Sequence, residues 1–93
     1  MKKQVLQKSE TEGAPFTTTG GVAVLVVTDV PDDESSALEV LSPSGNWVET
    51  DAIGDSSDWT TSFDSAANLF YRVVVGAVGG EAWVWDGADT QYR

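Results

Sequence analysis

The sequence contains neither cysteine nor histidine. Disulfides, thiolate nucleophiles and nearly all zinc sites are therefore excluded, and so are the catalytic triads that depend on histidine or cysteine. A chain of 93 residues buries only about 60 to 65% of its unfolded surface, so its stability is thin. Without disulfides or a structural metal, the expected support for such a small domain is oligomerisation or docking on a partner.

Long apolar runs are missing as well. Met1 is followed by two lysines, but the only apolar stretch before Gln7 is Val5-Leu6, whereas a secretory signal needs an apolar core of about 7 to 15 residues. The longest apolar run, Val22 to Val27, is far shorter than the roughly 20 residues that span a membrane. We therefore expect no signal peptide, no membrane association and synthesis in the cytoplasm.

Positive charge is scarce, since 5 lysines and arginines stand against 15 aspartates and glutamates, for a net charge of −10. Residues 1–16 carry +1, from three lysines against two glutamates, and residues 17–93 carry −11, from two arginines against thirteen acids. An acidic body repels phosphate backbones, so nucleic-acid binding is not expected. The charge either keeps copies of the chain apart or docks on a basic partner.

Two acidic segments, Asp29–Glu34 and Asp51–Asp58, offer carboxylate oxygens of the kind that calcium binds. Neither matches the spacing of an EF-hand loop, and solvated loops have the same composition, so no metal and no other cofactor is expected. Asp51, Asp55 and Asp58 lie close together in the sequence and could supply the carboxylate pair of a glycosidase. A domain of this size leaves little room for a substrate cleft, and we expect no enzymatic activity.

Short apolar stretches between turn signals predict an all-β fold. Val22–Thr28 is apolar on both alternations, which suits a strand covered on both sides or one at a subunit contact. Residues 37–42 and 47–50 flank the turn sequence PSGN at 43–46 and predict a hairpin, and residues 59–63 predict a further strand. Strands of about six residues with turns every 8 to 12 favour a small antiparallel β-sandwich or jelly-roll-like barrel.

Residues 1–20 show no sustained period and are predicted to be an extended N-terminal arm, followed by a single sandwich domain over residues 21–93. The arm is either a frayed terminus or a segment that becomes ordered on a neighbouring subunit. In the second case its expected partner contacts are Val5, Leu6, Lys8, Pro15 and Phe16.

The last two strands, residues 69–78 and 81–86, are predicted to form a hairpin around Gly79-Gly80, because a Gly-Gly loop reaches the positive φ of type I′ and II′ turns. In the resulting register Val75 opposes Val84, and opposed residues share a face. One face of this hairpin is apolar and is predicted to be core: Tyr71, Val73, Val75, Ala77, Ala82 and Val84.

The opposite face of the predicted hairpin combines aromatic and charged side chains. It is too aromatic for a solvated face and too charged for a dry core, which predicts a partner-contacting surface. Its expected contacts are Phe70, Arg72, Trp83 and Trp85. Two indoles on one strand face could instead stack on a sugar, and a cation–π contact between Arg72 and Trp85 could occupy one of the rings.

Three stretches resemble small β-sandwich modules of tailed-bacteriophage virions, which occur as head decoration (cement) proteins and as parts of fibres. They are Thr19-Gly20-Gly21 before an apolar strand, residues 38–48 (LEVLSPSGNWV), and residues 71–75 (YRVVV) before a glycine-rich turn. The likeness spans residues 17–86. It implies a place on the outer surface of the virion and contact with the major capsid protein, often as trimers, with no reaction and no cofactor.

We therefore expect a non-enzymatic capsid decoration protein that stabilises the phage head by bridging capsid subunits, as a homo-oligomer with a trimer favoured. A carbohydrate- or receptor-binding module of a phage fibre or spike is the first alternative. A head–tail connector or tail component is the second.

Overall fold

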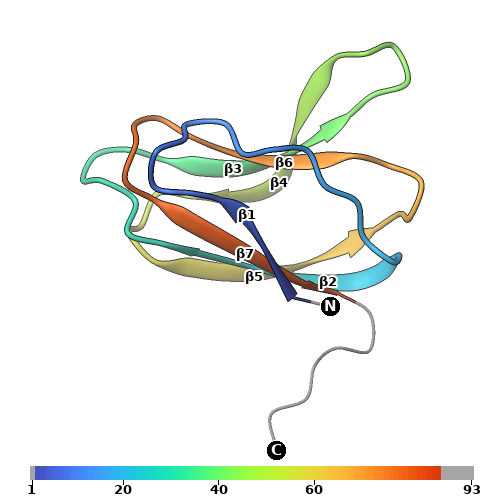
Figure 1. Cartoon of the computed structure of the whole chain (residues 1–93), viewed down its shortest axis with the longest axis horizontal. Helices are drawn as coiled ribbons and strands as arrows, with labels where there is room; N and C mark the ends of the chain where they lie inside the picture. The colour runs from blue at the N-terminus through green and yellow to red at the C-terminus, as the bar shows by residue number, and fades with distance from the viewer. Residues whose placement is uncertain (1, 87–93) are drawn as a thin grey trace, which may run out of the picture.

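The computed structural model describes residues 2–86, in which it places seven strands and no helix, as the all-β prediction requires. The strands pair antiparallel in two sheets that face each other as a small β-sandwich (Figure 1). The end of the predicted domain, residues 87–93, lies outside the described residues. The strands are β1 (Lys2–Leu6), β2 (Gly21–Thr28), β3 (Ser36–Leu41), β4 (Trp47–Gly54), β5 (Trp59–Ser65), β6 (Tyr71–Val75) and β7 (Glu81–Asp86).

The two sheets enclose one hydrophobic core between their inner faces. The four-stranded sheet has the order β1-β7-β2-β5, and the three-stranded sheet has the order β4-β3-β6. Because side chains alternate along a strand, every second residue points inward. The ring centroid of Tyr71 lies 5.6 Å from that of Phe63 and 5.9 Å from that of Phe16. The large side chains with essentially no exposure are Leu6, Leu25, Val27, Leu38, Val73 and Val84.

The hairpin predicted around residues 43–46 is confirmed as β3–β4. Leu41 pairs with Trp47, the Ser42 N–H donates to the Asn46 carbonyl (2.8 Å), and Gly45 has a φ of 91°. β4 is longer than predicted because it continues to Gly54. Its pairing with β3 is interrupted by a bulge over residues 50–52.

The hairpin predicted for the last two strands is wrong. β6 pairs with β3 in the three-stranded sheet, whereas β7 lies between β1 and β2 in the four-stranded sheet. Residues 76–80 cross from one sheet to the other, and Gly79, with a φ of 127°, donates its N–H to the Lys8 carbonyl (2.8 Å). Gly79 and Gly80 therefore belong to a crossing between the sheets beside Lys8 and do not form the predicted two-residue turn.

The inward face predicted for these two strands is nevertheless correct. Tyr71, Val73 and Val75 of β6 are buried, as are Ala82 and Val84 of β7, while Ala77 is half-buried in the crossing. Alternation of apolar and polar residues is the same for strands that lie side by side and for strands that face each other across a sandwich. The pattern thus fixed which side chains point inward and left the pairing undetermined.

The extended arm predicted for residues 1–20 is not observed over residues 2–20. Residues 2–6 form β1, an edge strand of the four-stranded sheet. Residues 11–16, which we call the strap, then run along the free edge of β6 (Figure 1), where the N–H groups of Gly13 and Phe16 donate to the carbonyls of Val73 and Tyr71 (both 2.8 Å). The N-terminal segment therefore joins the two sheets along one side of the sandwich.

Candidate functional site

The predicted arm contacts fall into two groups. Val5, Leu6 and Phe16 are buried in the core of their own chain, at 5%, 0% and 7% exposure. They could meet another subunit only if β1 and the strap left the sandwich. Lys8 and Pro15 are exposed, and the Lys8 Nζ lies 3.9 Å from Asp29 Oδ2. For these two residues a partner contact stays a prediction.

The four residues predicted to form one aromatic surface lie on two opposite faces of the sandwich. Arg72 is on the outer face of the three-stranded sheet, and Phe70, 48% exposed, immediately precedes β6. Trp83 and Trp85 are on the outer face of the four-stranded sheet. The prediction that Arg72, Trp83 and Trp85 point away from the core was correct. A shared surface, however, requires the β6–β7 pairing that the structure lacks.

Arg72 is held by partners within its own chain. Its Nε donates to Glu39 Oε1 on β3 (2.8 Å), and its Nη1 lies 3.6 Å from Glu12 Oε1 in the strap. Its guanidinium carbon lies 4.4 Å from the ring centroid of Trp47 on β4. The expected cation–π contact thus forms with Trp47, because Trp85 belongs to the other sheet. Arg72 links three neighbouring segments and is largely covered by them.

The outer face of the four-stranded sheet carries an apolar surface that we call the valine–tryptophan face: Val22, Val24, Val26, Trp83 and Trp85. The register places Val24 opposite Trp85 and Val26 opposite Trp83, so these side chains are neighbours. Val22 is 64% exposed and Val24 36%, and the other three are half-buried. Such a surface is typical of a contact site.

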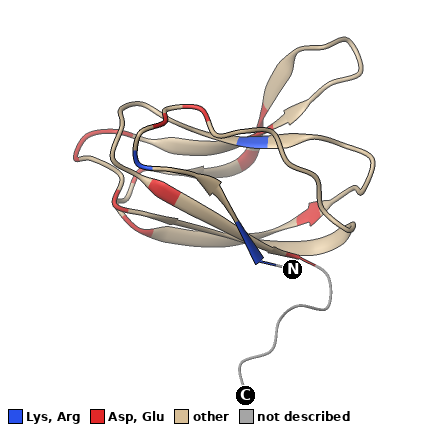
Figure 2. Ribbon diagram, viewed as in Figure 1, with Lys and Arg blue, Asp and Glu red and all other residues tan. Residues whose placement is uncertain are grey.

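Polar side chains border the valine–tryptophan face. Lys2 and Gln4 of β1 pair with Trp85 and Trp83, and the Lys2 Nζ lies 5.7 Å from the Trp85 ring centroid. The acids that the described strands bring to this face are Glu81 and Asp64. Many of the other acids lie in the loops at the left end of the sandwich (Figure 2). The face is therefore poor in acids on a strongly acidic chain.

The valines of β2 settle a question that the sequence left open. Ala23, Leu25 and Val27 are buried, so one alternation of the strand is core. The other alternation faces outward, and residues 2–86 leave Val22 and Val24 exposed. Of the two explanations for a strand that is apolar on both sides, coverage of the Val22 side is therefore not provided by the described residues, and a subunit contact stays a prediction.

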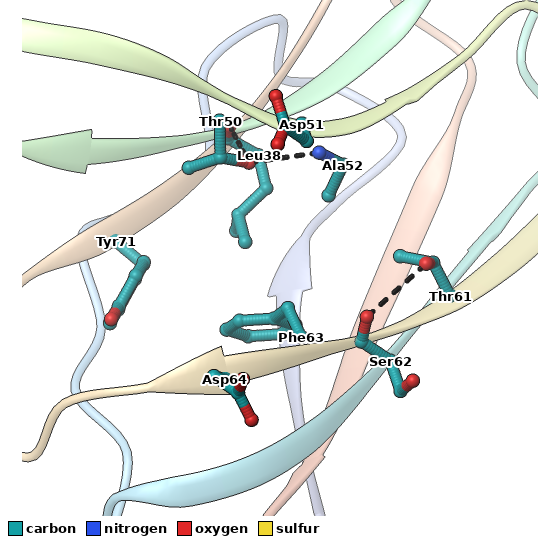
Figure 3. Close-up of a pocket in the computed structure, with 9 residues that line it drawn as sticks. All are labelled: Leu38, Thr50, Asp51, Ala52, Thr61, Ser62, Phe63, Asp64 and Tyr71. Carbon is teal, nitrogen blue, oxygen red and sulfur yellow. Dashed lines mark hydrogen bonds between the residues drawn. The ribbon is translucent and has the colours of Figure 1, made fainter.

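A second candidate site is a cleft of about 320 Å³ between β4 and β5 (Figure 3). The Leu38 and Phe63 side chains point toward each other across it (Figure 3). This site could not be predicted from the sequence, because it depends on which two strands border the open side of the sandwich. Its apolar lining is Leu38, Ala52, Phe63 and Tyr71, and its polar lining is Thr50, Asp51, Thr61, Ser62 and Asp64.

The bulge in β4 shapes one wall of this cleft. The Thr50 hydroxyl donates to the Leu38 carbonyl (2.9 Å) and accepts the Ala52 N–H (3.1 Å), which ties the bulge to β3. Bulges bend a strand and redirect its side chains. The bend therefore sets the direction of Asp51, which lies between Thr50 and Ala52 on the rim of the cleft.

Trp59 joins the two sheets close to the loop between β4 and β5. Its Nε1–H donates to Ser36 Oγ in the opposite sheet (2.7 Å), and Ser36 is buried. A Cβ at Gly54 would overlap the indole ring, so the close approach of Trp59 to β4 requires glycine at position 54. The indole and its hydrogen bond thereby fix the spacing of β4 and β5 at this end.

The three carboxylates of the hypothetical glycosidase pair lie in two places. Asp51 lines the cleft, whereas Asp55 and Asp58 are exposed in the loop after β4, and Asp58 Oδ1 accepts the Asp29 N–H (3.0 Å). Across residues 2–86, no three acidic side chains are placed to hold a metal ion. The same residues include no helix that is long and apolar enough to cross a membrane.

Asp86 is a buried carboxylate at the end of β7, at 2% exposure. Burial raises its pKa, but the Thr19 N–H, which donates to Oδ2 (2.7 Å), and positive charge at the start of the chain, Lys3 included, outweigh that effect. The pKa of Asp86 is therefore held below its ordinary value. This carboxylate ties β7 to the segment that leads into β2, a structural role.

Comparison of the chain with protein-family models, with curated proteins and with solved structures finds no match. The likeness to phage decoration and fibre modules therefore rests on the residues quoted above alone.

Proposed function

We propose that this protein is a non-enzymatic binding module, specifically a decoration protein that attaches to the outer surface of a tailed-phage capsid and bridges its subunits. The observation that carries the proposal is the valine–tryptophan face. It is apolar, left uncovered by residues 2–86 and poor in acids on a chain of net charge −10. The capsid as the partner comes from the resemblance of residues 17–86.

The proposed mechanism is the burial of apolar surface across subunit boundaries, with no chemistry. Burial contributes about 25 cal/mol for each Å² of apolar surface. A contact of a few hundred Å² would therefore give several kcal/mol before the costs of association. Binding to a folded chain also stabilises that chain by mass action, which suits a small domain without disulfides.

The test is the number of copies of this protein in purified particles, determined by quantitative mass spectrometry. Hundreds of copies support shell decoration, about 6 or 12 copies indicate a connector or tail position, and none refutes a place in the virion. Particles that lack the protein should lose their contents at lower temperature and after milder osmotic shock. Equal resistance of the two kinds of particle would refute the bridging role.

Sugar binding is the second candidate, because Trp83 and Trp85 lie two residues apart on one exposed face, with Gln4 and Lys2 beside them. Indoles in this arrangement stack on apolar faces of sugars. Tryptophan fluorescence separates the two candidates. Saturable quenching by sugars in the micromolar to millimolar range favours a receptor-binding module, and no response to a glycan panel, together with binding to capsids, favours decoration.

A further inference from the structure

The side of the sandwich between β4 and β5 is open at the level of the backbone. β5 pairs only with β2, and β4 pairs only with β3, so each strand has one free edge among the described residues. The opposite side is closed by β1 and the strap. Natural edge strands are usually protected by charged side chains, lysine especially, by proline or by bulges. β4 has a bulge, whereas β5 (WTTSFDS) has no bulge, lysine or proline and a single charged residue, Asp64.

From this geometry we propose that β5 binds an extended, basic segment of a partner protein as an added strand, with side chains of that segment filling the cleft between β4 and β5. β5 suits strand addition because its register with β2 runs without interruption from Gly21↔Ser65 to Val27↔Trp59. Main-chain hydrogen bonds would supply affinity, and alternate side chains would supply specificity. This site adjoins the valine–tryptophan face at Asp64, which pairs with Val22, but includes none of the valines and tryptophans of that face.

The cleft determines which side chains the added strand presents inward. Its apolar lining includes Leu38 from the opposite sheet and Phe63 from β5 itself, and its volume is about 320 Å³. That volume is at the lower limit for ligand pockets, so it holds a few side chains and no folded domain. Every second residue of the added strand is therefore apolar.

The charges at the rim of the cleft determine which residues the added strand carries on its other alternation, the side chains that point away from the cleft. Asp64 lies on the outer face of β5, in the same row of side chains as Thr60 and Ser62, and Asp51 stands on the β4 rim. Residues directly opposite each other on neighbouring strands interact most strongly. A lysine or arginine opposite Asp64 would be attracted, and an acid would be repelled. The net charge of −10 favours the same choice at longer range.

The experiment uses the full chain labelled with nitrogen-15 and a blocked seven-residue peptide in which lysine and valine alternate. We expect amide shifts confined to β5 and the bulge of β4, and slower hydrogen exchange at the free edge of β5. A glutamate–valine peptide should bind weakly or not at all. Asp64→Lys and Asp51→Lys should each weaken binding by about tenfold, while Asp55→Lys, the same charge change on the loop outside the cleft, should weaken it by less than about twofold.

Four results would overturn the proposal. They are no shift at millimolar peptide, shifts on β2 and β7 instead of β5, equal binding of the glutamate peptide, and an equal loss for Asp55→Lys. Thermal unfolding of each variant establishes that it is folded, and two rim variants on different strands keep the test valid if one of them is not.

Discussion

Gly13 gives a sharp test of how the N-terminal segment is built into the fold. It is buried in the strap, and its N–H donates to the Val73 carbonyl (2.8 Å). A Cβ at this position would overlap the carbonyl oxygen of Val5 and would lie 3.4 Å from the Val73 oxygen. Both neighbours are backbone atoms that cannot rotate away. Gly13→Ala must therefore displace either β1 or the strap.

The expected cost follows from these contacts. Overpacking typically costs about 1 to 3 kcal/mol, and loss of the hydrogen bond to Val73 adds about 1 kcal/mol. We expect Gly13→Ala to lower the free energy of unfolding by about 2 to 4 kcal/mol, out of roughly 5 to 14 kcal/mol for a chain of this length. The melting temperature should fall by about 10 to 25 °C.

Urea and thermal unfolding, followed by tryptophan fluorescence and circular dichroism, measure this effect. Gly76→Ala is the matched control, because a Cβ there meets only the carboxylate end of Glu34, a flexible side chain that can move aside. Both changes reduce the entropy of the unfolded chain equally, so their difference isolates the clash. If Gly13→Ala unfolds within about 0.5 kcal/mol of the control, the placement of the strap between β1 and β6 is wrong.

Three further predictions concern other parts of the fold. Leu6→Ala, which empties a fully buried position, should cost about 2 to 5 kcal/mol in urea unfolding, whereas a frayed terminus would show no change. Asp86 has a lowered pKa, so the stabilisation from its charged form is present above the unfolded pKa of about 3.9 and is lost as the pH falls through the folded pKa. Asp86→Asn should therefore be less stable at pH 7 and should lose less stability below about pH 4. Parallel plots of unfolding free energy against pH for the two proteins would contradict this. Arg72→Lys keeps the charge but loses the planar stacking on Trp47, so it should lower stability by roughly 1 kcal/mol and change tryptophan emission; unchanged emission would contradict the contact.

The sequence was sufficient for six of the seven strands, β2 to β7, and for the inward sides of the last two. Turn chemistry at residues 43–46 predicted the β3–β4 hairpin, because proline, glycine and asparagine act locally there. The alternation of residues 71–75 and 82–84 predicted which side chains are core. These are local signals, and local signals do not depend on which strands become neighbours.

Pairing and the candidate sites depend on long-range contacts. Gly79 and Gly80 favour a tight turn when the sequence is read locally, but a turn and a crossing between sheets can have the same composition. Val5 and Leu6 form an apolar stretch of only two residues, which is too short to predict that β1 completes the four-stranded sheet. The valine–tryptophan face required knowledge that β7 lies beside β2, and the cleft required knowledge that β4 and β5 are edge strands.

The most direct test of attachment through the valine–tryptophan face compares how two lysine variants are incorporated into particles. Val22→Lys places a charge on the valine–tryptophan face, where Val22 is 64% exposed, and Ile53→Lys makes a similar change on the other sheet, where Ile53 is 51% exposed. Both positions are solvent-facing, so both variants should fold. If this face attaches the protein to the capsid, Val22→Lys should be depleted from purified particles by about tenfold or more, while Ile53→Lys should be incorporated like the unmodified chain. Equal incorporation of the two variants would contradict attachment through this face.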